Sequence, residues 1–508
     1  MSILNHLQKL TRPQRHAFVA AFLGWTLDSL DFFLLVFCVN AIAGEFRTQP
    51  SAVLGAVFLT QAFRPVGALL FGVLADRYGR RPVLMANILG FSVIELACAF
   101  APSLNVLLVL RALFGIAMGG EWGVGAALVF ETLPREGRGT FSGILQEGYA
   151  LGSILASAAF GLFFAGIHWP LFGHVLVLPA IGWRGLFIMG ASPALLAFYV
   201  QARVPESPVW LAAAKKRRSR VALQEGPAWP QQLMHFLPTF LFLVVLMTAF
   251  MSFSHGTQDV YPTFLAVAIK LSPETIGLIG VLYGLGSIAG GIVFGALSET
   301  WGRKRAIITA ALLALPVIPL YAYGHTAVTL GIGAVLMQFM VQGAWGVVPA
   351  YLTELSPAPV RATAPGLAYQ LGALITSWNG KGQALAAERW GSYPAVLAVT
   401  VAVVAVALAG LTALGREAKG REMTEAQGRT YRIFLRPLRM RVNESGLQRS
   451  GSRGDRAQRG RAPEAVPARR APRSGDRGLR GLRFGGWQRG VCALHGLPRG
   501  RARRIAAI

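Results

Sequence analysis

The chain has 508 residues, of which 54% are hydrophobic and 14% charged, and its mean hydropathy is +0.49. Soluble domains carry about a quarter charged residues, so this composition excludes an ordinary soluble enzyme and predicts an integral membrane protein. The formal net charge of +26 does not indicate nucleic-acid binding, because most of the excess positive charge lies after residue 416. Three scattered cysteines exclude a disulfide framework.

The chain contains twelve stretches that are long and apolar enough to cross a bilayer, which needs about 20 mostly apolar residues. The first follows a polar N-terminus and is too long for the apolar core of a cleavable signal peptide. We predict an all-α membrane protein with spans near 17–42, 52–74, 83–101, 104–130, 140–166, 178–202, 236–261, 275–297, 306–323, 327–352, 363–380 and 392–414.

Lysine and arginine are concentrated in alternate loops between these spans. The loops around 76–82, 134–138, 215–220 and 302–305 are basic, whereas the intervening loops hold few positive charges. Basic loops stay in the cytoplasm, so both termini are predicted to be cytoplasmic.

An internal repeat relates the two halves of the chain. The segment 119–143 aligns without a gap with 342–366, and ten of the aligned positions are identical. The same constant offset, called the repeat offset below, places 72–80 on 295–303. It indicates two parallel repeats, the plan of transporters that bind substrate between their halves. We therefore expect six-helix bundles over 1–203 and 236–415, a cytoplasmic linker over 204–235, and a disordered Arg/Gly-rich tail over 416–508.

The segments GVLADRYGRR (72–81) and GALSETWGRKR (295–305) share a Gly, an acid four residues later, and then Gly-Arg. Small residues let helices approach closely, and the charged groups can pair across the halves when the cytoplasmic side is shut. The alternative is that the arginines only set topology. The candidate gating residues are Gly72, Asp76, Arg77, Gly79, Arg80, Glu299, Gly302 and Arg303.

These two segments, together with RALFGIAMGGEWG (111–123) and PESPVWL (205–211), resemble the signature motifs of the major facilitator superfamily. The resemblance covers residues 10–415. It implies alternating access, in which the two halves rock about a central substrate site.

Several charged residues lie inside the predicted spans, where ionisable groups are costly and mark function by default. Asp28 and Asp31 are three residues apart and share a helix face. Two close carboxylates cannot both ionise cheaply, so the pair is a candidate proton carrier or a pair of structural acids. Arg64, midway along the second span, must meet an anion, which is either a protein carboxylate or the substrate's carboxylate.

Further charges lie in the third to fifth spans. Arg111 is a second candidate for substrate binding, and Glu121 and Glu147 are candidates for proton coupling. Glu95, in the third span, is assigned a structural role. The second half has fewer such charges, so we expect the first half to hold much of the charge chemistry.

The seventh span ends in SHGTQDVYPT (254–263). His255 and Asp259 are four residues apart and form one polar stripe with Gln258 between them. A histidine changes charge near neutral pH, and an amide can bind a carboxylate. The stripe therefore predicts proton coupling at His255 and Asp259 and substrate binding at His255 and Gln258, with a purely structural helix-end network as the alternative.

The same segment resembles the seventh-span signature of the sialate/carboxylate:proton symporter family, especially its lactate and pyruvate permeases. That signature reads N-x-x-[S/T]-H-x-[S/T]-Q-D-x-x-x-T, and this chain departs from it only at Met251, which replaces the Asn. The resemblance implies that His255 and Asp259 affect proton coupling and that Gln258 affects recognition.

Other functional classes find no support in the residues. The match GLGSIA (284–289) to a dinucleotide fingerprint lies inside a span without a preceding strand, so it indicates helix packing. Zinc spacings, a P-loop and a nucleophile elbow are not found in the sequence, so we expect no enzyme activity, metal or cofactor, and ion gradients must supply the energy. For the tail we weigh a shifted reading frame, a lipid anchor and RNA binding.

The sequence thus predicts a monomeric proton symporter of a bacterial inner membrane that imports a small monocarboxylate such as lactate or pyruvate. Its partners would be a small organic anion, a proton and the lipid bilayer, without nucleic acid. Sialic acid is the first alternative substrate, and an aromatic acid or dicarboxylate is the next. A non-transporting nutrient sensor on the same fold is the alternative of a different class.

Overall fold

The computed structural model describes residue 6 and residues 8–164, 167–171, 174–178, 180–223, 229–421 and 423. These residues belong to one compact unit, Met1–Pro437. The second unit, Leu438–Ile508, lies outside the described residues, so the predictions for most of the tail have no structural counterpart.

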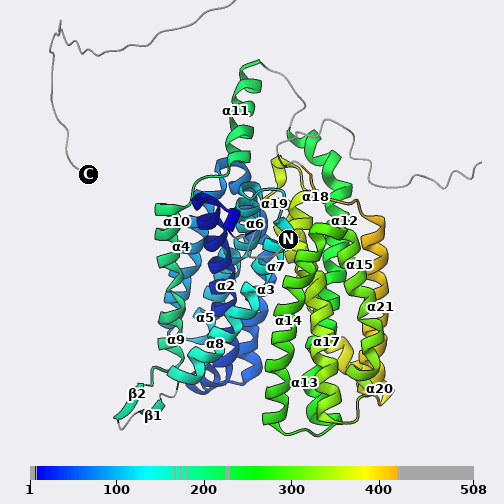
Figure 1. Cartoon of the computed structure of the whole chain (residues 1–508). Coiled ribbons are helices and arrows are strands. Elements are labelled where there is room, and N and C mark those ends of the chain that lie inside the picture. Colours follow the sequence, from blue (N-terminus) through cyan, green and yellow to red (C-terminus); the bar gives the residue numbers. More distant parts are fainter. Residues whose placement is uncertain are drawn as a thin grey trace, which may run out of the picture. The chain divides into compact units, whose positions relative to one another are not determined.

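Two helical bundles, one from each half of the sequence, make up this unit (Figure 1). The first contains α2 (Arg12–Glu45), α3 (Pro50–Tyr78), α4 (Arg80–Ala99), α5 (Leu104–Gly119), α6 (Glu121–Thr132), α7 (Arg138–Gln146), α8 (Gly148–Phe163), α9 (Gly182–Gly190) and α10 (Pro193–Arg203). The second contains α12 (Trp229–Gln258), α13 (Tyr261–Thr263), α14 (Pro273–Trp301), α15 (Arg303–Leu313), α16 (Ile318–Tyr323), α17 (Ala327–Trp345), α18 (Val348–Leu355), α19 (Thr363–Thr376), α20 (Asn379–Trp390) and α21 (Tyr393–Leu414).

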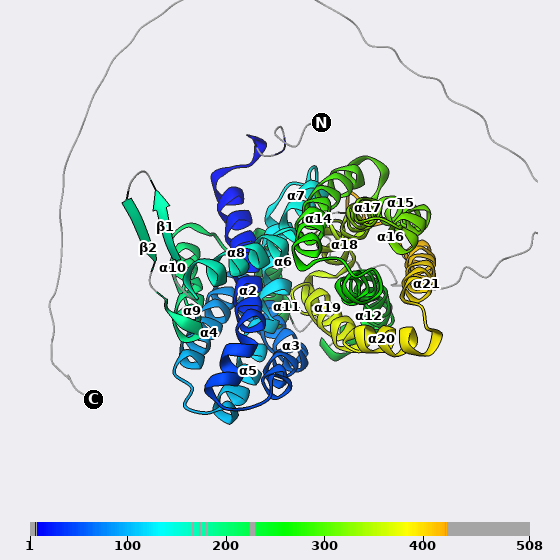
Figure 2. The same ribbon diagram turned by 90° about the horizontal axis from the view of Figure 1, so that it is seen from below.

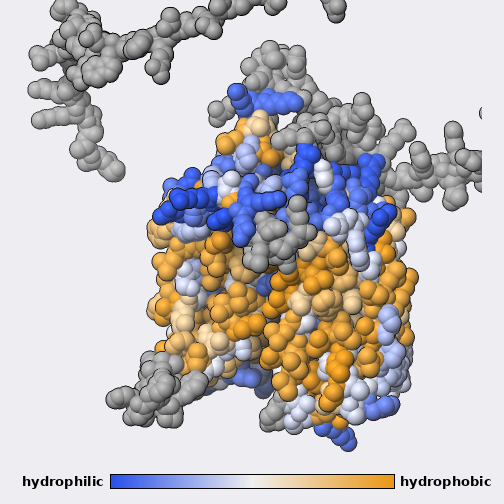
Figure 3. Space-filling model, viewed as in Figure 1, coloured by the Kyte–Doolittle hydropathy of each residue, from blue (hydrophilic) through white to orange (hydrophobic). Residues whose placement is uncertain are grey.

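Ten helical stretches of the described residues are long and apolar enough to cross a membrane. The other two predicted spans, 140–166 and 363–380, are each formed by a pair of shorter helices, α7 with α8 and α19 with α20. An apolar band crosses the middle of the molecule on the face shown in Figure 3, with polar residues above and below it. Large exposed side chains such as Phe58, Val93 and Leu195 belong to these spans and would face lipid. The predicted membrane fold is confirmed.

The structure differs from the sequence-based expectation in three places. A short antiparallel hairpin of β1 (Ile167–Leu171) and β2 (His174–Leu178) lies between α8 and α9, with Ile167 opposite Leu178. The predicted linker contains a helix, α11 (Pro208–Leu223), and α12 begins at Trp229, earlier than the predicted residue 236. Arg416, Glu417, Arg421 and Met423 are hydrogen-bonded to residues of the two bundles, so the predicted disordered tail does not begin at 416.

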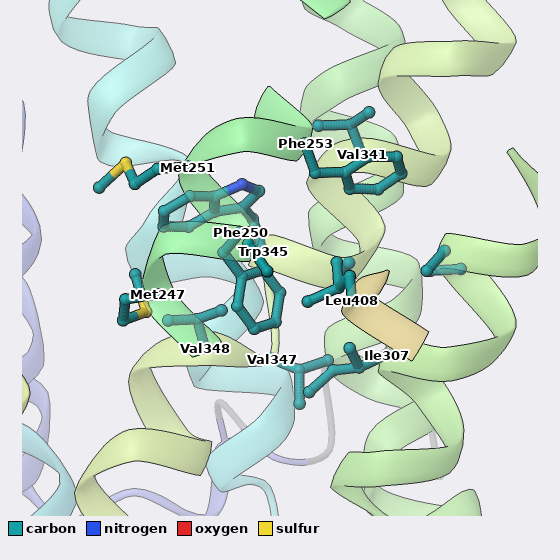
Figure 4. Close-up of a cluster of buried hydrophobic side chains, with 14 of the residues drawn as sticks. Met247, Phe250, Met251, Phe253, Ile307, Val341, Trp345, Val347, Val348 and Leu408 are labelled. Carbon is teal, nitrogen blue, oxygen red and sulfur yellow. The ribbon is translucent and has the colours of Figure 1, made fainter. Parts of the chain in front are cut away.

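The two bundles lie side by side (Figures 1 and 2), and two pairs of helices make most of the contact between them. α3 packs against α19, and α14, its repeat equivalent, packs against α7. The apolar core of the second bundle includes Phe250, Met251 and Trp345 (Figure 4), and it extends to Trp25 and Trp122 of the first bundle. The apolar core is therefore continuous across the boundary between the halves.

Helix starts are stabilised differently on the two sides of the molecule. α5, α14, α17 and α21 begin with their own Ser or Thr caps, at Ser103, Ser272, Thr326 and Ser392. The helices α4, α7, α15 and α19 begin on the side with the basic loops, and their preceding residues provide no side-chain cap. The first backbone N–H groups of a helix need acceptors from elsewhere, and carboxylates from other elements supply them.

Candidate functional site

On the basic side, Asp76 at the end of α3 closes the boundary between the halves. Its carboxylate accepts hydrogen bonds from the backbone N–H groups of Ala362 at 3.1 Å and Thr363 at 3.0 Å, and from the Thr363 hydroxyl at 2.6 Å. A carboxylate at a helix N-terminus satisfies unpaired amides and matches the helix dipole. Asp76 therefore caps α19 of the opposite half.

Glu299 at the end of α14 makes the equivalent contact in the other direction. Its carboxylate accepts hydrogen bonds from the backbone N–H of Gly137 at 3.1 Å and from that of Gly139, at the start of α7. The repeat offset places Asp76 on Glu299 and Gly139 on Ala362. The two acids thus form a pair of reciprocal caps related by the internal repeat.

The predicted gate arginines pair within their own halves. Arg80 donates two hydrogen bonds to Glu131, at 3.1 and 3.0 Å, and Arg303 donates two to Glu354 at the same distances. Each arginine also contacts the capping acid of its own half, with Arg303 2.9 Å from Glu299. Bidentate arginine–carboxylate pairs are strong and directional, so these two pairs hold the caps in position.

A second pair of arginines, absent from the predicted gate, crosses the boundary. Arg361 lies 3.3 Å from Glu131, and its repeat equivalent Arg138 lies 4.0 Å from Glu354. All four residues are identical in the two repeats. That identity was the sequence signal that could have identified them.

The glycines of the predicted gate allow close approach or an unusual backbone. A Cβ atom on Gly72 would lie 2.6 Å from the Thr363 Cα, so α3 and α19 pack too closely for a larger residue. Gly79 and Gly302 have positive φ angles of 119° and 96°, which glycine adopts without strain. Arg77, by contrast, is exposed and lies over the ring of its neighbour Tyr78.

Two further acids cap the helices that begin after these glycines. Glu206 accepts hydrogen bonds from the backbone N–H groups of Arg80 and Arg81, and Glu417 does the same for Arg303 and Lys304. Each follows the last helix of its half. Glu206 lies in the PESP segment, whereas nothing in the sequence analysis identified Glu417.

The short segment after α21 also contacts the crossing arginines. Arg138 donates to the backbone carbonyl of Arg421 at 3.2 Å, and Arg361 donates to that of Met423 at 3.1 Å. The hydroxyl of Tyr351 donates to the carbonyl of Arg416. This segment therefore belongs to the closed basic side.

Inside the first bundle, Arg64 and Asp28 form a buried ion pair with an Nη2–Oδ2 distance of 2.6 Å. The other terminal nitrogen of Arg64 donates to Gln61 at 3.1 Å. Glu121 lies within electrostatic range of both members of the pair, and its Oε2 atom has no hydrogen-bond partner in the described part of the chain. One positive group thus faces two acids here.

Asp31 belongs to a different group of charges. Arg111 is fully buried and pairs with both oxygens of Glu95, at 3.0 and 2.9 Å. Asp31 lies beside this pair, and neither of its carboxyl oxygens has a hydrogen-bond partner among the described residues. The two acids predicted as a candidate proton carrier therefore have different ion-pair partners, although Asp28 still acts on Asp31 electrostatically. Arg111 lies beside two protein carboxylates, Glu95 and Asp31.

Glu147 separates α7 from α8 and is buried. A Cβ atom on Gly291 of α14 would collide with its Oε1 atom, so the carboxyl reaches the opposite half. Oε1 has no hydrogen-bond partner within the described residues.

At the end of α12, His255 and Asp259 are joined by a hydrogen bond of 3.1 Å, and their side chains are 42% and 37% exposed. Gln258 donates to Ser254 and to Gln338 of α17, both at 3.0 Å. The predicted polar stripe is present. Gln338, which the sequence analysis did not identify, joins it.

Two family descriptions match consecutive parts of the chain. "Sugar (and other) transporter" matches residues 18–237, and "Major Facilitator Superfamily" matches residues 260–443. The chain belongs to the major facilitator superfamily. It is therefore a multi-pass membrane transporter rather than an enzyme.

Curated members of the superfamily are similar to this chain at about a quarter of positions. A carboxylic acid transporter protein homolog of Saccharomyces cerevisiae is 27% identical over 74% of this chain, which spans 61% of the yeast protein. The sialic acid transporter NanX of Escherichia coli is 26% identical over 72% of this chain and 85% of its own length. These relatives are named for transport of organic acids.

Among solved structures of the superfamily, the proton:xylose symporter XylE superposes with a TM-score of 0.65 over 81% of this chain and 98% of XylE. Sequence identity is 18%, so this likeness concerns the fold. With both reciprocal caps formed, this major facilitator protein is closed on its basic side.

Proposed function

We propose that this protein is a proton-coupled importer of a small monocarboxylate, with lactate or pyruvate as the expected substrate, in a bacterial inner membrane. Both termini would be cytoplasmic, which places the basic closed side inside the cell. The observation that carries the proposal is the buried Arg64–Asp28 pair, at 2.6 Å, beside Glu121.

This geometry supports coupling between an anion and a proton. Arg64 keeps its charge under all physiological conditions, and in the resting pair Asp28 neutralises it. A substrate carboxylate can replace Asp28 on Arg64 at low cost only if Asp28 takes up a proton, because a second unpaired buried anion is expensive. Entry of one anion with one proton leaves the net charge of the site unchanged.

The seventh-span stripe supports the same proposal from the second bundle. His255 and Asp259 are accessible and hydrogen-bonded, which suits a group that receives a proton, and the amide of Gln258 can bind a carboxylate. In the proposed cycle, a proton binds at Asp28 or Asp31, or at His255 and Asp259. The anion then binds Arg64 with help from Gln258, and the halves rock so that Asp76 and Glu299 release their amides.

Other substrates are alternatives within the same mechanism. The name of the relative NanX favours sialic acid as the first of them, although a sugar acid needs more hydroxyl partners. An aromatic acid or a dicarboxylate is next, with Arg111 as a second anion contact only if Glu95 releases it. A sensor that does not transport would not need the buried carboxyl oxygens of Asp31 and Glu121 that lack hydrogen-bond partners among the described residues.

The test is uptake of radiolabelled lactate into proteoliposomes with an imposed inward proton gradient, with competition by pyruvate, acetate, sialate and succinate. We expect gradient-stimulated uptake that pyruvate inhibits. Asp28→Asn should retain substrate exchange between equal pools but lose the response to the gradient, because it removes the proton site and leaves Arg64 free.

Competition-sensitive uptake of sialate without uptake of lactate would change the proposed substrate and keep the mechanism. Absence of uptake of every acid by folded wild-type protein would reject transport in favour of the sensor.

A further inference from the structure

Three indole rings surround one tyrosine at the boundary between the halves. The centroid of the Tyr369 ring, on α19, lies 4.7 Å from Trp122, 5.7 Å from Trp345 and 6.1 Å from Trp25. Trp25 and Trp122 belong to the first bundle and Trp345 to the second. Trp122 and Trp345 are repeat equivalents, so the cluster lies where the repeat brings both bundles together.

The indole N–H groups of this cluster are buried and unpaired. Trp25, Trp122 and Trp345 are 2%, 3% and 3% exposed, and the Nε1 atom of each has no hydrogen-bond partner among the described residues. A buried donor without an acceptor is costly, and three such donors lie around one tyrosine ring. Acceptor atoms of a bound molecule would satisfy these donors.

Two other tryptophans of this chain have acceptors for their indole N–H groups. The N–H of Trp183, on the side opposite the basic loops, donates to Glu45. The N–H of Trp210, in α11, donates to the backbone carbonyl of Asp76 at 3.1 Å. Simple packing of tryptophan therefore does not account for the three unpaired donors around Tyr369.

The cluster adjoins the groups to which the proposed function assigns the anion and the proton. Trp25 lies three residues before Asp28 on the same helix face, and Tyr369 is within electrostatic range of Arg64 and Asp28. The ring of Tyr149, 5.7 Å from Trp25, lies within range of Arg64 and also of Asp259 in the second bundle. Tyr149, which packs against Trp25, thus lies within range of both charged groups.

We propose that Trp25, Trp122 and Trp345 form part of the substrate site, donating their indole N–H groups to the oxygen atoms of a carboxylic acid whose body lies against the rings. This inference rests on the proposed function and names the residues that recognise the acid. Both halves contribute a donor, so the bound acid connects them. Arg64 supplies the charge, and the indoles supply direction and an apolar surface.

The test measures binding and melting on purified full-length protein in nanodiscs. Each indole is replaced singly by phenylalanine, which keeps a ring against Tyr369 and removes only the N–H. Trp390→Phe is the matched control, because Trp390 is 55% exposed at the end of α20. Lactate, pyruvate and sialate are titrated by intrinsic fluorescence, and unfolding temperatures are measured with and without each acid.

We expect the apparent Kd of the bound acid to rise about tenfold in each of the three variants and not in the control, the usual effect of losing one hydrogen bond to a charged group. Unfolding temperatures without acid should be unchanged or slightly higher, because the variants remove an unpaired buried donor. The stabilisation by the acid should fall. A weaker stabilisation by the acid without a lower unfolding temperature of the free protein is not expected from a packing role.

The inference is overturned if wild-type protein binds an acid and all three variants bind it as tightly as the control does. Lower unfolding temperatures with unchanged Kd would assign the indoles to packing and overturn it as well. If wild-type protein neither binds nor takes up any acid, the proposed function fails, and this inference fails with it.

Discussion

Asp76 accepts two hydrogen bonds from Thr363, one from its backbone N–H at 3.0 Å and one from its hydroxyl at 2.6 Å. The two residues belong to opposite halves of the chain, and the contact caps a helix that lacks a cap of its own. Closure of the basic side and helix capping are therefore the same interaction. When that side opens, the amide groups at the start of α19 lose Asp76 as their acceptor. This loss favours the closed state.

Replacing Asp76 by alanine should weaken closure locally. The backbone N–H groups of Ala362 and Thr363 lose their acceptor, at a cost of about 0.5–2 kcal/mol, as for a lost helix cap. Hydrogen–deuterium exchange should become faster at the start of α19. The control is Glu299→Ala, which should accelerate exchange at Gly137 and Gly139 instead. If the two variants showed the same exchange rates at both helix starts, reciprocal capping would be contradicted.

Two glycines on α14 should respond oppositely to alanine. A Cβ on Gly295 would lie 2.6 Å from the carbonyl oxygen of Gly139 and 2.9 Å from the Gly143 Cα, whereas one on Gly284 meets nothing within 4 Å. Gly295→Ala should destabilise the protein by about 1–3 kcal/mol through overpacking. Gly284→Ala should be neutral or stabilising by up to about 1 kcal/mol. Unfolding in detergent measures both, and similar effects of the two substitutions would argue against a close α14–α7 contact.

The enclosed pair of Arg111 and Glu95 should behave as a unit. Arg111→Met leaves the buried Glu95 carboxylate without its partner and should cost about 3–5 kcal/mol. The double variant Arg111→Met/Glu95→Gln removes both charges and should recover most of that loss. Denaturant titration of the two single variants and the double variant gives the coupling, and additive losses would show that the pair is not coupled.

The stability contributed by Glu417 should depend on pH. Burial would raise the pKa of its carboxyl, but backbone N–H groups of Lys419, Arg303, Lys304 and Ala418 donate to it and hold the pKa below its ordinary value of 4.5. A lowered pKa in the folded state means that the contribution is complete above the unfolded pKa and is lost as the pH falls through the folded one.

The difference in stability between wild-type protein and Glu417→Gln should therefore be largest at neutral pH, up to about 1 kcal/mol, as for a lost helix cap. Unfolding temperatures of the two proteins measure it. The difference should vanish in acid. A difference that stays constant from pH 7 to pH 3 would show that the Glu417 charge is not responsible.

Much of the fold and the positions of the gate groups could be predicted from local and repeated features of the sequence. Apolar length predicted the spans, and the repeat offset predicted which positions in the two halves are equivalent, including Asp76 with Glu299. The i, i+4 spacing predicted the His255–Asp259 contact, which the structure confirms at 3.1 Å. Such features concern neighbours on one helix or matching positions in the two repeats, so they do not depend on how helices meet.

The choice of partners was decided only by the tertiary structure. Asp28 and Asp31 share a helix face, yet one meets Arg64 of α3 and the other lies beside Glu95 and Arg111. Helix packing determines which charges from different spans come within reach, and in a low-dielectric interior that distance decides the pairing. The same reason explains why the indole cluster around Tyr369 could not be seen in the sequence, since its rings come from four helices that only the packed bundles bring together.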